Sequence, residues 1–333
     1  MIDKYNRNID YMRMSITDLC NLRCKYCMPD GMRIQKLPMA EILTYEELLE
    51  IAKAAVECGI TKFKITGGEP LARKGCAGFI KKLKEVSGVQ QVTMTTNGVV
   101  LEENLQMLAD AGLDAVNISL DTLKADVFSE ITGRDRHAEV IKGVEATIAA
   151  GIKVKLNTVL QKGINDGEWH DIVLFAKKHG IDVRFIEIMP IGYGKGMEVI
   201  SNDFLRKELQ KIYPDMSDDM SIHGNGPATY VKIPGFNGSI GFISAIHGKF
   251  CGDCNRIRLT ATGKLKPCLC YGDTIDVKKI VRENDGEDEV TRYKRHKRLI
   301  SVIHDAVLSK PREHCFDKIA DVTEMKEMVQ IGG

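Results

Sequence analysis

The chain lacks several features that would assign it to a special class of protein. It has a single Trp, aromatic residues make up 6% of its 333 residues, and its formal net charge is +1. No run approaches the roughly 18 apolar residues of a membrane span, and the polar start MIDKYNRNID has no apolar signal-peptide core. We therefore expect a globular cytoplasmic protein that binds neither membrane nor nucleic acid through its overall charge.

Cysteine, in contrast, is plentiful, with ten residues. In a reducing compartment, clustered cysteines indicate metal binding or catalysis rather than disulfides. Two tight groups stand near opposite ends of the chain. The first is Cys20, Cys24 and Cys27, and the second is Cys251, Cys254 and Cys268, with Cys270 as a competing third ligand. The isolated Cys58, Cys76 and Cys315 are interpreted as buried structural residues.

Short β-rich runs alternate with helical patterns over the first half of the chain. The expected strands are 12–17, 61–66, 91–96, 114–120, 153–159 and 182–189, and helices are expected at 45–59 and 103–112. Such alternation predicts βαβ units and a parallel sheet. We predict an α/β fold, an incomplete TIM-type barrel of about six βα units within residues 1–225.

The remaining residues, 226–333, have a different texture and are expected to form a smaller C-terminal α+β domain. TYVKIPG, GSIGFISA and RIRLTATGKLKP resemble short antiparallel strands, and residues 292–308 are expected to be helical. The polar stretch 213–227 is interpreted as a linker.

The predicted strands are polar on one face. Arg13, Lys64, Asn117 and Lys155 share the parity that alternates with apolar residues. Parallel sheets seldom expose a face to solvent. We therefore expect the sheet to curl around a wet, cationic cavity that suits a large polyanion.

The first cysteine group follows the first predicted strand, where α/β folds place active-site loops. Structural zinc sites use four protein ligands, and nothing nearby supplies a fourth. A [4Fe–4S] cluster held by three thiolates keeps one iron open for another ligand.

The spacing CxxxCxxC, with Tyr26 just before the last cysteine, resembles the signature of the radical S-adenosylmethionine superfamily. GGEP (67–70), NISLD and FIEIMP fit this resemblance, each at the end of a predicted strand. It implies that the open iron binds S-adenosylmethionine, which is cleaved to a 5′-deoxyadenosyl radical. The cofactor contacts that it implies are Tyr26, Gly67, Gly68, Glu69, Ser119 and Met189.

The spacing of the second cysteine group leaves two interpretations open. Cys251, Cys254 and Cys268 fit a second cluster with an open iron, whereas the same three with Cys270 fit a structural zinc site. Spacing alone does not decide between them.

CxxCxRxRL, the thirteen-residue gap to Cys268 and the terminal Gly332–Gly333 resemble the GTP 3′,8-cyclase family of molybdenum cofactor biosynthesis. That resemblance implies a second [4Fe–4S] cluster that binds guanine, catalytic roles for Arg256 and Arg258, and a tail that reaches the active site. The substrate contacts that it implies are Arg13, Lys64, Thr95, Lys155, Arg184, Arg256, Ile257 and Arg258. Lys64 departs from the Arg common in the family, so the geometry of its phosphate contact is open.

The same resemblance implies conversion of GTP to 3′,8-cyclo-7,8-dihydroguanosine triphosphate. The partners would be a flavodoxin- or ferredoxin-like electron donor and a downstream cyclic pyranopterin monophosphate synthase, with the chain a monomer or a homodimer. Two alternatives are a radical maturase with an auxiliary cluster that modifies a peptide, and a zinc-stabilised nucleotide-binding protein without redox chemistry.

Overall fold

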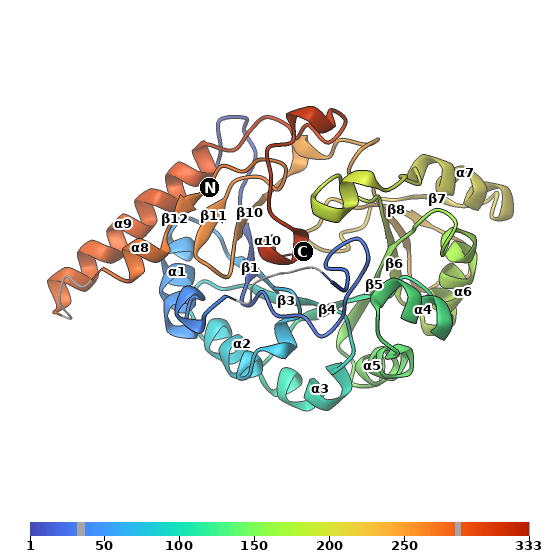
Figure 1. The fold of residues 1–333 in the computed structure, drawn as a ribbon, viewed down its shortest axis with the longest axis horizontal. Helices are drawn as coiled ribbons and strands as arrows, with labels where there is room; N and C mark the ends of the chain where they lie inside the picture. The colour runs from blue at the N-terminus through green and yellow to red at the C-terminus, as the bar shows by residue number, and fades with distance from the viewer. Residues whose placement is uncertain (32–36, 284–287, 333) are drawn as a thin grey trace.

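The computed structural model describes residues 1–31, 37–283 and 288–332, and a curved sheet is its centre (Figure 1). The strands predicted for the first half are β1 (Tyr11–Ser15), β2 (Lys62–Thr66), β3 (Gln91–Thr96), β4 (Ala115–Ser119), β5 (Lys153–Val159) and β6 (Asp182–Ile186). They pair side by side in chain order, and every pair is parallel. The predicted parallel α/β sheet is confirmed.

Helices between these strands cover the outer face of the sheet (Figure 1). They are α1 (Tyr45–Glu57), α2 (Cys76–Lys84), α3 (Leu101–Asp110), α4 (Ala125–Thr132), α5 (His137–Ala149) and α6 (Trp169–His179). Thr44 and Glu47 form a capping box that fixes the start of α1. Short 3₁₀ turns lie at η1 (Met39–Glu41), η2 (Pro70–Ala72), η3 (Asp166–Glu168), η4 (Gly192–Gly196), η5 (Cys251–Asp253) and η6 (Ile319–Asp321).

The later strands extend the same sheet at both edges. They are β7 (Ser217–Asp219), β8 (Thr229–Lys232), β9 (Ile240–Ile243), β10 (Arg256–Leu259), β11 (Lys264–Lys266) and β12 (Ile275–Asp276). Across the described residues the order is β12-β11-β10-β1-β2-β3-β4-β5-β6-β9-β8-β7, an arc whose two ends are different strands. The arrangement is consistent with a partial TIM barrel.

The antiparallel pairing expected for the later strands is only partly correct. β8 pairs antiparallel with β7 and with β9, and β11 pairs antiparallel with β10 and with β12. β7 lies within the stretch 213–227, so the linker expected there is in part a strand of the sheet. However, β9 lies parallel to β6, and β10 lies parallel to β1. Parallel neighbours are joined by long crossover connections. The residue pattern within each strand therefore does not predict which distant strand it pairs with.

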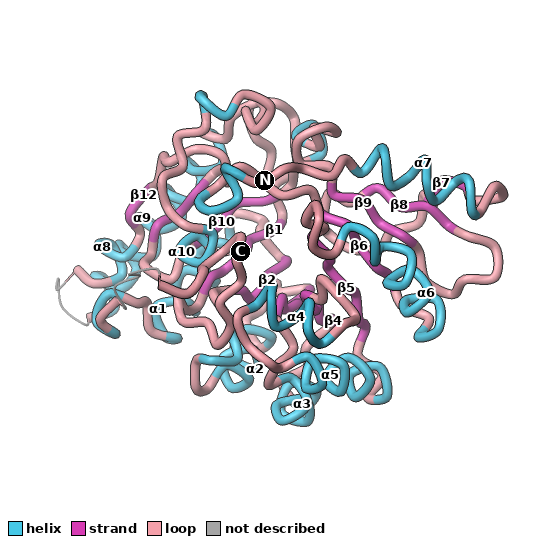
Figure 2. Tube along the Cα trace, turned by 45° about the vertical axis from the view of Figure 1, so that its right-hand side comes forward, coloured by secondary structure: helices cyan, strands magenta, loops and turns pink. Residues whose placement is uncertain are grey.

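Four further helices complete the described chain: α7 (Asn202–Ile212), α8 (Lys278–Val281), α9 (Glu289–Leu308) and α10 (Met328–Ile331). The helix predicted at 292–308 is confirmed as α9, which lies along α1. α10 and the C-terminus lie inside the arc of strands in both views (Figures 1 and 2). No described helix is long and apolar enough to cross a membrane.

Alternation along the strands separates the core from the interior of the arc. Met12 and Met14 of β1 are fully buried in the main apolar cluster, whereas Arg13 between them lines the cavity. Val183, Arg184 and Phe185 repeat the pattern in β6. The apolar residues that seal the helices to the sheet therefore also fix which polar side chains point inward.

Candidate active site

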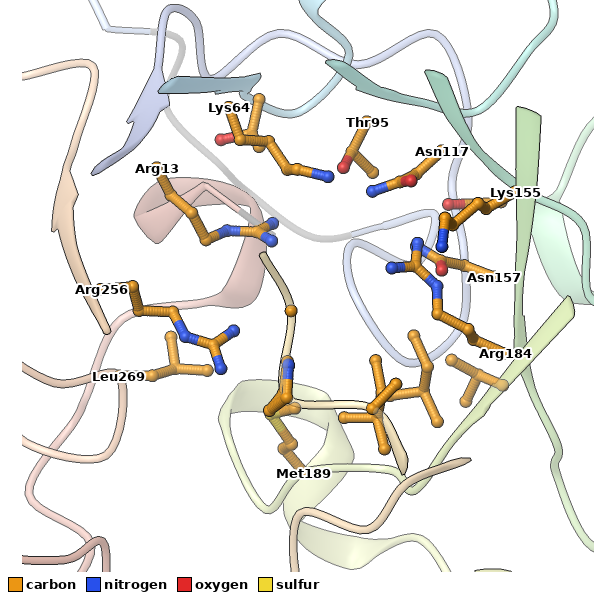
Figure 3. A pocket seen from close by; sticks show the side chains of 18 of the residues that line it. Arg13, Lys64, Thr95, Asn117, Lys155, Asn157, Arg184, Met189, Arg256 and Leu269 are labelled. Atoms are coloured by element: carbon orange, nitrogen blue, oxygen red, sulfur yellow. The ribbon is translucent and has the colours of Figure 1, made fainter. Parts of the chain in front are cut away.

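A cavity of about 980 Å³ lies inside the arc of strands, and both cysteine groups line it. Its wall includes Arg13, Lys64, Thr95, Asn117, Lys155, Asn157 and Arg184, from six neighbouring strands. Figure 3 shows Arg13 and Arg256 on one side and Lys155, Asn157 and Arg184 on the other. The predicted cationic cavity inside a curled sheet is confirmed.

Cys20, Cys24 and Cys27 follow β1, and all three line the cavity. The backbone N–H groups of Cys27 and Met28 both donate to the Cys24 carbonyl, at 3.0 and 2.8 Å, which makes the loop a tight turn. The Cys20 Sγ accepts from the Leu22 N–H at 3.5 Å. Burial raises the pKa of all three thiols, that of Cys27 to about 12.

Gly67 and Gly68 line the cavity beside this loop. A Cβ on Gly68 would lie 2.4 Å from the Leu19 carbonyl oxygen, and one on Gly67 would lie 2.7 Å from that of Thr17. A larger residue would therefore push the two loops apart. The glycines allow the backbone after β2 to lie against the start of the cysteine loop.

Glu69 has a different position from its neighbours. Its side chain is fully buried and is not part of the cavity wall that the described residues form. It accepts hydrogen bonds from the Thr96 hydroxyl at 2.8 Å and from the backbone N–H groups of Asn97 and Leu71 at 2.7 and 3.0 Å. Burial raises the pKa of Glu69 to about 7 despite these donors. Glu69 thus ties the glycine loop to the end of β3.

The other expected cofactor contacts, Tyr26, Ser119 and Met189, all line the cavity. The Tyr26 hydroxyl donates to Asp121 at 2.8 Å. Asp121 also accepts from the Val159 N–H at 2.8 Å, so the tyrosine is fixed to the ends of β4 and β5. These residues stand at the carboxyl ends of strands, close to the first cysteine group.

The cations expected to contact substrate surround the same space. Arg13, Lys64, Lys155, Arg184, Arg256 and Arg258 line it, together with Thr95. Burial, followed by the charges of Arg184 and Arg13, lowers the pKa of Lys64 well below its usual value. Ile257 is fully buried in the apolar core and is not among the described lining residues, because alternation turns it away from its neighbours Arg256 and Arg258.

The second cysteine group lines the cavity with Cys251, Cys254 and Cys268. Burial acts to raise the pKa of Cys254, but the charges of Arg256 and Lys310 and nearby N–H donors outweigh it and lower the pKa to about 7. The other two thiols have raised pKa values, chiefly through burial. Cys254 is therefore the thiol of this group that ionises most readily.

Cys270 points elsewhere. It is fully buried, its Sγ lies 3.0 Å from that of Cys315, and it accepts from the Cys315 N–H at 3.3 Å. It is absent from the described cavity wall, whereas Cys268 is part of it. In this arrangement Cys270 does not complete a four-cysteine zinc site with the second group.

The C-terminal segment forms part of the cavity wall. Met328 and Val329 line the cavity, and the Gly332 carbonyl accepts from Arg13 at 3.5 Å. Gly332 has φ of +83°, and a Cβ there would lie 2.7 Å from that of Ser15. The tail is therefore seated against the end of β1 as far as Gly332, and Gly333 lies outside the described residues.

Sequence reasoning missed several groups at this site. Asn97 donates to the Asn21 side chain at 2.6 Å and lies 3.8 Å from the Cys20 Sγ. Tyr230 contacts Lys155 at 3.2 Å from the later part of the chain. The motif TTNG (95–98) at the end of β3 could have indicated Asn97 as a site residue. Tyr230 lies in a β-rich run that carries no such motif.

The cavity fits a polar ligand and iron–sulfur groups by two observations. The Thr95 hydroxyl and the Asn157 carbonyl oxygen are buried, and no hydrogen-bond partner for them exists among the described residues. Both three-cysteine groups line the cavity as free thiols, and thiolate sulfur is the ligand that iron–sulfur clusters use. The wall thus supplies soft sulfur ligands at two places and hydrogen-bonding groups between them.

Comparisons with known proteins agree with this geometry. The profile of the radical SAM superfamily matches residues 14–176, and that of Molybdenum Cofactor Synthesis C matches residues 181–316. In fold, the chain resembles Streptococcus suis SuiB bound to S-adenosylmethionine, with a TM-score of 0.63 and 15% identity over 98% of this chain and 79% of that one.

Curated relatives are similar over the whole chain. GTP 3′,8-cyclase of Clostridium perfringens is 39% identical over 333 residues, and that of Alkaliphilus oremlandii is 42% identical over 341. The enzyme of Petrotoga mobilis is 43% identical, and each alignment covers 100% of both chains. The chain belongs to the GTP 3′,8-cyclase family of the radical SAM superfamily.

Proposed function

We propose that this chain converts GTP to (8S)-3′,8-cyclo-7,8-dihydroguanosine 5′-triphosphate, the first step of molybdenum cofactor biosynthesis. One observation carries the proposal: two three-cysteine groups line one cavity, together with cations from at least five strands. A radical generated at one group is thereby confined with a polyanionic substrate held near the other. The names of the curated relatives support the same reaction.

Two [4Fe–4S] clusters and S-adenosylmethionine are the cofactors that we propose. Cys20, Cys24 and Cys27 would hold the first cluster, and Cys251, Cys254 and Cys268 the second. Gly67 and Gly68 would let the loop after β2 lie beside the first group, where a larger side chain would collide with the Thr17 and Leu19 carbonyls. Tyr26, Ser119 and Met189 would complete the S-adenosylmethionine site, with Glu69 holding the glycine loop in place.

GTP would lie across the cavity with its guanine at the second cluster. Arg256 and Arg258 would lie beside the guanine. The charge of Arg256 acts to lower the pKa of Cys254, and the charge of Arg258 acts to lower the pKa of Cys268, which places both arginines near the second group. The triphosphate would be bound by Arg13, Lys64, Thr95, Lys155 and Arg184. Charge-assisted bonds to phosphate oxygens are strong, and Arg can make them in pairs.

When bound by Cys20, Cys24 and Cys27, the first cluster would supply the electron for reductive cleavage of S-adenosylmethionine, and so the radical chemistry directed at C3′ of GTP. The chain itself binds and orients the substrate and excludes water from the cavity. The tail supports this role, since Gly332 lies against Arg13 and Val329 lines the wall beside the first cysteine group.

We further propose a cytoplasmic location, a flavodoxin- or ferredoxin-like electron donor and a downstream cyclic pyranopterin monophosphate synthase. Residues 1–225 would form the barrel part and 226–333 the part that carries the second cluster. The likeness to SuiB concerns the fold alone, whereas the cations in the cavity wall suit the triphosphate of GTP.

The test is anaerobic incubation of the purified, reconstituted protein with a reductant, S-adenosylmethionine and GTP. We expect GTP to disappear only when all components are present, and 5′-deoxyadenosine to form faster with GTP than without it. A colourless protein that contains zinc and no iron would refute the proposal.

A further inference from the structure

Lys310, which follows α9, lies behind the second cysteine group with its ammonium group buried. It is 4% exposed. Its Nζ donates to the Arg256 carbonyl at 2.8 Å, to the Pro267 carbonyl at 2.9 Å and to the Cys254 Sγ at 3.6 Å. It therefore links the backbone beside Cys254, the backbone beside Cys268 and the sulfur of Cys254 itself.

The three contacts indicate that Lys310 is protonated in this position. An ammonium group has three donors and no acceptor, which matches three acceptors around it. A neutral amine would direct its lone pair at one of them. The ammonium group therefore lies directly against the Cys254 sulfur, at 3.6 Å.

The same segment donates to another thiol of the group. The backbone N–H of His314 donates to the Cys251 Sγ at 3.3 Å, and Cys268 receives a backbone N–H from Cys270. Each of the three sulfurs therefore accepts a hydrogen bond from the chain. Cys254 receives hydrogen bonds from two charged side chains of the described residues, Arg256 in the cavity wall and Lys310 behind the group.

Arg7 holds this segment against the cysteine loop. Its guanidinium donates to the Cys251 and Arg312 carbonyls at 2.9 and 3.0 Å and to the Pro311 carbonyl at 2.7 Å. A buried salt bridge to Asp3 at 2.6 Å fixes the guanidinium. The position of Lys310 is therefore set from outside the cavity and does not depend on substrate.

The first cysteine group has a different electrostatic environment. The charges that raise the pKa values of its thiols come from Glu69, Asp121 and Glu327, as well as from the neighbouring thiols. Hydrogen bonds to sulfur, local charge and burial set the reduction potential of an iron–sulfur cluster. A cation on one ligand sulfur favours the reduced form, which carries one more negative charge.

We propose that Lys310 is a positioning residue of the second cluster, which fixes the Cys254 thiolate and raises the cluster's reduction potential through its charge. This inference rests on the proposed second cluster. It assigns a role to a residue outside the cavity wall that the described residues form. The hydrogen bond to Cys254 would favour retention of the electron at the GTP side of the cavity.

The test compares Lys310→Leu, which removes the charge, with Lys310→Arg, which keeps it. Lys318→Leu is the matched control, because Lys318 is an exposed lysine further along the same segment. Each holoprotein is reconstituted anaerobically, its iron is counted, and both clusters are titrated against potential by electron paramagnetic resonance. The first cluster serves as an internal reference.

We expect the reduced-to-oxidised ratio of the second cluster in Lys310→Leu to fall at least tenfold at a fixed potential, about 59 mV for a one-electron couple. Lys310→Arg and Lys318→Leu should stay near the parent protein, and the first cluster should not move. Loss of about four irons in Lys310→Leu but not in Lys310→Arg would also support the role.

Two results would overturn the inference by itself. One is a parent protein with about eight irons and a Lys310→Leu variant with the same second-cluster potential. The other is equal loss of iron in Lys310→Leu and Lys310→Arg, which would assign only a packing role. A parent protein with about four irons would overturn the second cluster as well.

Discussion

Arg13 of β1 and Lys64 of β2 are register partners on neighbouring parallel strands, and both side chains point into the cavity. Arg258 of β10 is the register partner of Arg13 on its other side. Three cations thus stand in one row across three adjacent strands, where like charges oppose each other at a spacing of about 4.8 Å. Repulsion among the three cations destabilises the ligand-free fold. An anion that binds in the cavity next to the row relieves this repulsion.

Removing one cation should therefore stabilise the ligand-free protein. Lys64→Met keeps the length of the side chain and removes its buried charge, so we expect the free energy of unfolding to rise by about 1 kcal/mol. The added stability from GTP should shrink at the same time, because one phosphate contact is lost. Thermal unfolding with and without GTP measures both effects.

The matched control is Lys62→Met, since Lys62 lies on the same strand but pairs with Asp10 at 2.8 Å outside the cavity. It should leave the stabilisation by GTP unchanged. Equal effects of the two variants on GTP-dependent stability would contradict the assignment of Lys64.

Arg256 and Arg258 should be needed for GTP and dispensable for S-adenosylmethionine. Both line the cavity beside the second cysteine group. Arg256→Ala and Arg258→Ala should each weaken GTP binding at least tenfold, since a charge-assisted contact is worth about 1.5–3 kcal/mol.

Slow cleavage of S-adenosylmethionine without GTP should persist in both arginine variants. Calorimetry with GTP and an assay for 5′-deoxyadenosine separate the two functions. Normal GTP affinity in both variants would sink the substrate assignment.

Cys268 and Cys270 should behave differently when replaced. The Cys268 thiol lines the cavity, whereas the Cys270 thiol faces Cys315. Cys268→Ser should reduce the iron content from about eight to about four per chain. Cys270→Ser should keep about eight, with a modest loss of thermal stability because a polar hydroxyl replaces a buried thiol.

The reverse outcome for these cysteines, with iron lost from Cys270→Ser alone, would mean that the ligand set is misassigned. Zinc bound in a ratio of one per chain, and lost from both variants, would favour the four-cysteine zinc site instead.

GTP binding should weaken as the pH rises through about 8. Burial lowers the pKa of Lys155 to about 8, although Asp182 at 2.7 Å acts to raise it. Above this pH Lys155 loses its positive charge in the ligand-free cavity. Binding of GTP must then be coupled to uptake of a proton by Lys155. Calorimetry in buffers of different ionisation enthalpy at pH 8.5 should report proton uptake, and Lys155→Met should reduce it.

Folding stability should respond to pH in the opposite direction. The unfolded chain holds the Lys155 proton up to about pH 10.4. Between about pH 8 and 10.4 the unfolded state therefore binds more protons than the folded one, and this lysine's contribution to stability increases with pH. Lys155→Met should flatten that contribution in denaturant titrations. An unchanged pH dependence in the variant would show that another group titrates.

The sequence revealed the strands and the wall of the cavity because alternation is local. Arg13, Lys155 and Arg184 each stand between buried apolar residues, so parity alone directs them inward. The same rule directs the Ile257 side chain into the core, so the substrate contact implied at that residue would have to come from its backbone.

Other features depend on contacts between distant segments. The parallel pairing of β10 with β1 brings the second cysteine group to the cavity, and no local pattern reports it. No sequence pattern identifies Lys310 either, because its role depends on hydrogen bonds to the distant backbone carbonyls of Arg256 and Pro267. The spacing of Cys268 and Cys270 could not separate them, whereas the direction of each thiol does.

The central claim is that a radical formed at the first cysteine group acts on GTP in the same cavity. Its most direct test is one turnover with GTP deuterated at C3′, followed by mass spectrometry of the 5′-deoxyadenosine. We predict one deuterium in the 5′-deoxyadenosine, with the cyclised nucleotide formed in equal amount. GTP consumed while the 5′-deoxyadenosine carries no deuterium would contradict the account.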